Sequence, residues 1–85
     1  MPATSPILLI LGSGPKVGAA VAQKFLNSGY RVATASRSKQ DKQDSANELS
    51  ISLDLSQPQA IPAVFAKVKQ TFGSVPNVVV YNGQN

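Results

Sequence analysis

A glycine-rich turn that joins a short apolar run to an amphipathic segment constrains this chain more than any other feature. The apolar run is Ile7–Leu11, which carries no charge and has the length of a strand buried on both faces. The segment after the turn, about residues 16–27, places Val17, Val21 and Phe25 at helical spacing. A strand, a glycine turn and a helix in this order form an anion cradle, because unpaired backbone N–H groups and the positive end of the helix dipole meet at the turn. The turn therefore predicts a phosphate site, although tight turns of this kind also use glycine for steric reasons alone.

Length and composition narrow the possible functions. The 85 residues predict one small domain spanning 1–85, and 42% hydrophobic with 14% charged residues is typical of a globular chain. Cysteine and histidine are absent, which excludes disulfides, thiolate metal sites and the commonest general base. The net charge of +4 comes from scattered basic residues with only five aromatics (two Tyr, three Phe), so nucleic-acid binding is not predicted.

The sequence predicts neither a membrane span nor a secretory signal. The apolar run Ile7–Leu11 is too short to span a membrane, and Met1–Pro6 has no basic residue of the kind that opens a secretory signal. We therefore expect a soluble, cytoplasmic protein that does not bind membranes.

Three further strands are predicted. Gly29 suits the left-handed position after the first helix, and a strand follows at about residues 30–35. Residues 39–48 are polar and predict a loop with at most a short exposed helix, whereas residues 49–55 alternate strictly between apolar and polar side chains, as in a half-buried strand at a sheet edge. The last strand is Asn77–Tyr81.

A second helix is predicted between the last two strands. Ser56 is the expected N-cap, with Gln59 completing a capping box, and Pro62 requires either an irregular first turn or a regular helix that starts near it. One apolar stripe should face the core, formed by Ile61, Phe65, Val68 and Phe72.

Strands and helices that alternate in this way predict a parallel sheet with right-handed crossovers. The fold class is α/β: a three-layer Rossmann-type fold, truncated, with about four strands in the spatial order 3-2-1-4. The strand patterns agree, because the third strand alternates as an edge strand does, and the first and fourth are apolar throughout.

The end of the second strand indicates which dinucleotide fits the cradle. An acidic residue about 20 positions past the last glycine holds the ribose of NAD in Rossmann sites, but here that place is taken by Arg37 between Ser36 and Ser38. An arginine with two hydroxyl donors fits the extra phosphate of NADP, so NADP(H) is the expected cofactor, although Arg37 is also compatible with a solvated strand end. The lack of an acidic residue also argues against an S-adenosylmethionine site.

Two more positions have alternative interpretations. Lys16 lies within the glycine turn and either adds charge near the adenosine or is simply an exposed residue of the first helical turn. Asp54 either accepts a hydrogen bond from the adenine amino group, with Leu55 behind the adenine ring, or caps the following helix.

Between Ile7 and Gly83 the chain resembles the N-terminal half of a short-chain dehydrogenase/reductase. The family's TGxxxGxG motif corresponds to Leu11–Gly18, where Gly12 and Gly18 match, Leu11 replaces the threonine and Lys16 replaces the middle glycine. The Arg after the second strand and the Asp-Leu pair after the third also match NADP-preferring members, whereas the Asn-Asn-Ala-Gly motif matches only at Asn82. The resemblance and the residue patterns together imply cofactor contacts from Gly12, Ser13, Gly14, Lys16, Val17, Gly18, Ser36, Arg37, Ser38, Asp54, Leu55, Asn82 and Gly83.

The family's catalytic Ser and Tyr-x-x-x-Lys pair are not found in this sequence. No catalytic or metal-ligating residue is therefore assigned, and no hydride transfer is expected from these residues alone. The resemblance implies the NADP(H)-binding N-terminal portion of a short-chain dehydrogenase/reductase-like oxidoreductase without its catalytic half. The alternative is a stand-alone, non-catalytic nucleotide-binding or structural module.

The fourth strand, Asn77–Tyr81, is apolar on both faces yet lies at an edge in the order 3-2-1-4. Such an edge favours pairing with another chain, so we expect self-association, or pairing with a missing C-terminal half, through this strand.

Overall fold

The computed structural model describes residues 5–12, 15–37, 42–54 and 56–81, with the side chains of 15–18 and 44 outside the description. The described elements, in chain order, are β1 (Ile7–Leu11), α1 (Pro15–Asn27), β2 (Arg31–Ser36), β3 (Lys42–Ser45), β4 (Glu48–Ser52), a 3₁₀ turn η2 (Pro58–Ala60), α2 (Ile61–Phe72) and β5 (Val78–Tyr81).

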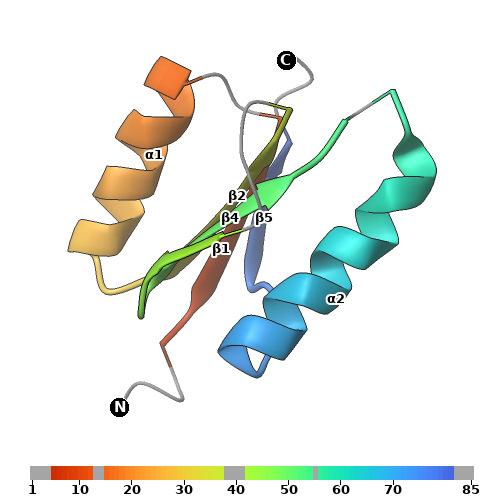
Figure 1. Ribbon diagram of the computed structural model, residues 1–85. Helices are drawn as coiled ribbons and strands as arrows, with labels where there is room; N and C mark the ends of the chain where they lie inside the picture. The colour runs from red at the N-terminus through yellow and green to blue at the C-terminus, as the bar shows by residue number, and fades with distance from the viewer. Residues whose placement is uncertain (1–4, 13–14, 38–41, 55, 82–85) are drawn as a thin grey trace.

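One sheet forms the middle layer of the molecule, in the order β3-β4-β2-β1-β5. The pairs β4–β2, β2–β1 and β1–β5 are parallel, and only β3 runs antiparallel, beside β4. Helix α1 covers one face of the sheet and α2 the other (Figure 1). The predicted α/β Rossmann-type fold and the relative order of the four parallel strands are confirmed.

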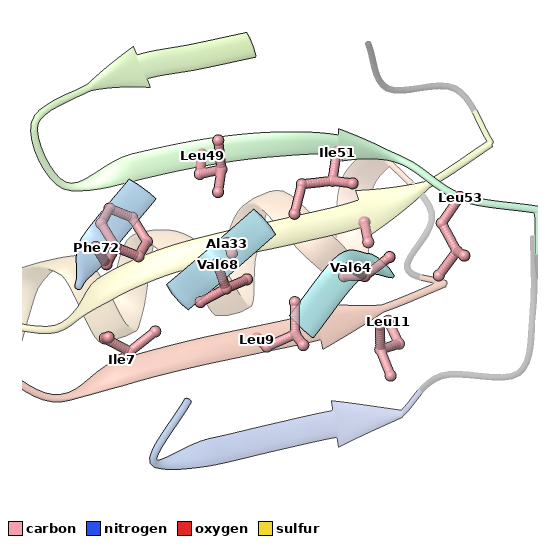
Figure 2. Packing of buried hydrophobic residues seen from close by; sticks show 11 residues of the cluster. Ile7, Leu9, Leu11, Ala33, Leu49, Ile51, Leu53, Val64, Val68 and Phe72 are labelled. Atoms are coloured by element: carbon pink, nitrogen blue, oxygen red, sulfur yellow. The ribbon is translucent and has the colours of Figure 1, made fainter. Parts of the chain in front are cut away.

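The loop predicted for residues 39–48 is wrong where the structure describes it. Lys42–Ser45 form β3, which turns at Ala46 and Asn47 and pairs with β4 (Figure 2). The segment lacks an apolar face because an exposed edge strand needs backbone pairing rather than burial of its side chains. The edge position expected for the strand at 49–55 is therefore also wrong, since β3 lies outside β4.

Two apolar clusters occupy the two faces. On the α2 side, alternate residues of β1, β2 and β4 pack against the buried face of α2 (Figure 2). On the α1 side, Leu8, Ile10 and Val32 pack against partly buried residues of α1 and against Val78 and Val80 of β5. Strand β1 is buried at every position because both helices pack on it or beside it, as its unbroken apolar run predicted.

The predicted capping box before α2 is wrong. The Ser56 hydroxyl donates to the Asp54 carboxylate at 2.7 Å, and the N-cap of α2 is Ala60, which makes no side-chain capping bond. The irregular start required by Pro62 is confirmed, because a 3₁₀ turn precedes the regular helix from Ile61.

The core stripe of α2 is displaced by part of a turn from the predicted one. Val64, Val68 and Phe72 are its buried residues, and Ile61 and Phe65 are only partly buried. Spacings of four residues keep Val64, Val68 and Phe72 on one face of the helix.

Candidate functional site

Three chain segments meet at the carboxyl edge of the sheet. Leu11 pairs with Ala35, and Ser36 pairs with Ser52, so β1, β2 and β4 end almost level with one another. Their next residues are Gly12 after β1, Arg37 after β2, and Leu53-Asp54 after β4. In open α/β sheets, ligands bind outside the carboxyl ends of the strands, where the connections diverge. Here that point lies beside β1, whose neighbours β2 and β5 follow on opposite sides.

Gly12 turns the chain out of β1 toward the helix. It is buried with a φ of 75°, a left-handed conformation that side-chain-bearing residues rarely adopt. Its N–H donates to the Ala35 carbonyl at 2.7 Å, which attaches the start of the turn to β2. The backbone conformation by itself therefore requires glycine at this position.

Helix α1 begins at Pro15, directly behind this turn. A proline at the first helical position gives up an N–H that the helix would not use, and the next N–H groups of the first turn have no partner within the helix. The first turn of α1 contains no acidic residue, so its positive dipole end is not neutralised from within the helix. These features suit an anion.

Ser36 and Arg37 lie side by side at the end of β2 but differ in exposure. Ser36 is 2% exposed, and its carbonyl accepts a hydrogen bond from the Leu53 N–H at 3.0 Å, which continues the β2–β4 pairing. Arg37 is exposed, so its guanidinium is the group at this strand end that is accessible to a ligand.

Asp54 is fixed by hydrogen bonds at the end of β4. Its carboxylate accepts from the Ser56 N–H at 2.9 Å and from the Ser56 hydroxyl at 2.7 Å. These bonds, and to a smaller extent the nearby Arg37 charge, lower the pKa of Asp54. The alternative in which Asp54 caps the following helix is wrong, because the carboxylate closes a local turn and Ala60 precedes α2.

The other predicted contacts fall outside what the structure describes. For Lys16, Val17 and Gly18 only the backbone of the first turn of α1 is given. Six predicted contact residues lie outside the described residues altogether, namely Ser13, Gly14, Ser38, Leu55, Asn82 and Gly83.

Sequence reasoning missed one charged residue near this edge. Lys42 opens β3 and is exposed. The sequence signal for a hairpin was the two-residue turn Ala46-Asn47 before the alternating strand at 49–55. The polar composition of residues 39–48 favoured a loop instead. In the part of the chain that is described, there is no group of three metal-ligating side chains and no helix long and apolar enough to cross a membrane.

Curated proteins with similar sequences are oxidoreductases by name. The chain is 39% identical over 82 residues to the short chain dehydrogenase/reductase dmxR12 of Cryptosporiopsis sp., covering 96% of this chain and 32% of that protein. It is 29% identical to an uncharacterized oxidoreductase of Staphylococcus aureus (95% and 38% covered). It is 27% identical to a probable 2,4-dienoyl-CoA reductase of Caenorhabditis elegans (89% and 28% covered). The chain thus spans about a third of the length of these relatives. No protein-family model matches the sequence.

A solved structure agrees on the fold. A doubly substituted short-chain dehydrogenase/reductase from Serratia marcescens superposes with a TM-score of 0.75 at 21% identity, over 96% of this chain and 37% of that one. In sequence and in fold, the chain therefore corresponds to the N-terminal portion of a short-chain dehydrogenase/reductase.

Proposed function

We propose that this chain binds NADP(H) at the carboxyl edge of its sheet, as the cofactor-binding portion of an NADP(H)-dependent oxidoreductase of this family. The pyrophosphate lies over the Gly12 turn and the start of α1, and the adenosine lies between the ends of β2 and β4. In this proposal, the residues of the glycine turn and Asn82 keep the contacts predicted from the sequence, and the protein is cytoplasmic.

The observation that carries the cofactor choice is the exposed Arg37 directly after β2. An acidic residue at this place would accept the ribose hydroxyls of NAD and repel a 2′-phosphate. A guanidinium instead offers paired N–H donors to phosphate oxygens. The hydrogen bonds from Ser56 fix the Asp54 carboxylate at the end of β4, which supports its proposed place beside the adenosine.

Calorimetric titration of the 85-residue chain with NADP⁺ and NAD⁺ tests the proposal. We expect tighter binding of NADP⁺, and an Arg37→Asp variant should reverse the preference. Lys69→Asp is the matched control, because it reverses an exposed charge in the last turn of α2, near the amino edge of the sheet. Equal affinity for both cofactors that Arg37→Asp leaves unchanged would contradict the proposal.

We also propose that β5 is a pairing edge, used by a second copy or by the rest of a longer protein. Val79 and Tyr81 of β5 are 44% and 65% exposed, and no described strand lies beyond β5. An apolar strand edge of this kind favours pairing with another strand.

A further inference from the structure

The register of the β3–β4 hairpin places Lys42 near the proposed adenosine site. Lys42 lies opposite Ser50 of β4. Ser52, two residues further along β4, is its diagonal neighbour, at a Cα separation of about 7–8 Å that a long side chain can bridge. Ser52 in turn lies opposite Ser36, the residue before Arg37.

These side chains share the α1 face of the sheet. Ala35 and Ile51 belong to the cluster beneath α2, so the alternate residues Ser36, Ser50 and Ser52 point to the other side. Lys42 shares the face of Ser50 because directly opposed residues of an antiparallel pair lie on the same side. The start of α1, where the proposed phosphate cradle lies, is on this face as well.

Helix α1 does not extend over the outer strands of this face, and Ser50, opposite Lys42, is nevertheless only 8% exposed. Among the described elements, α1 packs against β1 and β2 but not against β4 or β3. Lys42 and Ser52 are both exposed. The Lys42 ammonium can therefore extend along the surface of β4 toward the end of β2.

The charges at this edge leave room for a further cation, besides Arg37 and Lys16, if a 2′-phosphate binds there. The Arg37 charge acts on the Asp54 carboxylate, and the charges of the two side chains sum to zero. A phosphate monoester carries a charge of about −1.5 to −2 at pH 7. Arg37, even together with the Lys16 contact predicted from the sequence, therefore leaves part of that charge uncompensated, because Asp54 offsets one positive charge.

We infer that Lys42 is a second determinant of cofactor choice, which binds the 2′-phosphate of the adenosine from the β3 side while Arg37 binds it from β2. The inference rests on the proposed function. In this way the β3–β4 hairpin, which was not predicted from the sequence, increases the preference for NADP(H) over NAD(H).

The test uses adenosine 2′,5′-bisphosphate and adenosine 5′-monophosphate, which differ only in the 2′-phosphate. Both are titrated at low ionic strength into the 85-residue chain and into the variants Lys42→Gln, Lys42→Arg and Lys69→Gln. We expect Lys42→Gln to weaken binding of the bisphosphate about three- to fivefold, the range of an exposed charge pair, and to leave the monophosphate unchanged. Lys42→Arg should retain the affinity, and Lys69→Gln should behave as the unaltered chain does. Added salt should shrink the effect.

The outcomes separate this inference from the proposed function. If the unaltered chain does not prefer the bisphosphate, the proposed function fails and the role of Lys42 fails with it. If the preference is present but Lys42→Gln leaves it intact, or Lys69→Gln reduces it equally, only the inference about Lys42 is overturned. A loss shared by Lys42→Gln and Lys42→Arg would assign Lys42 a structural role and would also overturn the inference.

Discussion

Arg31 carries a buried charge at the start of β2, at the end of the sheet opposite the proposed site. It is 8% exposed, and its guanidinium donates to the carbonyls of Phe72 and Ser5, both at 2.7 Å. It also lies 5.3 Å from the centroid of the Phe72 ring. Phe72 ends α2, so Arg31 satisfies a carbonyl that the helix leaves unpaired and places a cation at the negative end of its dipole.

We predict that Arg31→Met lowers the free energy of unfolding by about 2–4 kcal/mol, because two carbonyl groups at this end lose their donors. Arg31→Lys should recover part of the loss, since an ammonium cannot reproduce the two-armed geometry. Urea unfolding followed by circular dichroism measures both variants. A change below about 0.5 kcal/mol for Arg31→Met would contradict this account of the residue.

The role of Arg31 was not predictable from the sequence. An arginine before Val32 is the ordinary exposed first residue of a strand, and arginine is seldom buried. Only the return of α2 to the amino edge brings Phe72 over it, a contact between residues 41 positions apart. The position of Arg37 directly after β2, in contrast, was predictable, because it depends on local spacing from the glycine turn alone.

The lowered pKa of Asp54 makes the free energy of unfolding decrease at acidic pH. Hydrogen bonds from Ser56, and then the Arg37 charge, lower the pKa of Asp54, so the folded chain favours the carboxylate. This contribution is present above the ordinary pKa of about 3.9 and is lost as the pH falls through the lowered pKa. We predict that Ser56→Ala raises the pKa of Asp54 toward its usual range. Carboxyl NMR titration measures it, with Ser74→Ala as control, and unchanged titration in Ser56→Ala would refute the assigned cause.

At the scale of elements, the β3–β4 hairpin and the start of α2 show where sequence patterns stop being informative. The parallel strands were predictable because burial dictates their composition. Strand β3 is held by backbone pairing at an exposed edge, so its side chains carry no such signal. Before α2, Ser56 is a residue type that often caps helices, but its hydroxyl binds the Asp54 carboxylate instead. The 3₁₀ turn η2 also separates Ser56 and Asp54 from the helix.

The end of α2 depends on Gly73, which is left-handed with a φ of 83° and donates its N–H to the Lys69 carbonyl at 2.7 Å. A Cβ added there meets no atom within 4 Å, so the cost of Gly73→Ala is backbone strain alone. We predict a loss of about 1 kcal/mol in the free energy of unfolding. Ser74→Ala, next to it and exposed, should change stability by less than about 0.5 kcal/mol. Equal effects of the two substitutions in urea unfolding would show that the left-handed conformation of Gly73 does not determine the loss of stability.

At the scale of the whole molecule, the two edges of the sheet differ in chemistry. The β3 edge is polar, and its pairing with β4 is irregular between Gln43 and Ser45. The β5 edge is Val78–Tyr81 without a charge. On the α2 side, that helix packs over β2 and β4 and leaves Val79 and Tyr81 exposed. The β3 edge is therefore protected against pairing with another strand, whereas the β5 edge favours such pairing.

We therefore predict that the 85-residue chain self-associates through β5. Light scattering across a concentration series should show mass rising with concentration, and Val79→Lys should suppress the rise by placing a charge on the apolar edge. Gln43→Lys on the opposite edge is the matched control and should have no effect. A monomer at every concentration, with Val79→Lys no different, would contradict the prediction.

The topology of the molecule was predictable from local patterns because right-handed crossovers leave few arrangements of alternating strands and helices. The same topology brings Gly12, Arg37 and Asp54 to one edge, as the site prediction required. What the patterns did not reveal was the antiparallel strand outside β4, and with it the position of Lys42.

The most direct test of the central claim is residue-resolved NMR of the ¹⁵N-labelled chain during titration with NADP⁺. Binding at the carboxyl edge predicts saturable shifts at the amides of Gly12, Arg37 and Asp54, and little change at Arg31 and Gly73 near the amino edge. The absence of saturable shifts, or shifts centred on the amino edge, would contradict the claim that this chain holds the cofactor where its parallel strands end.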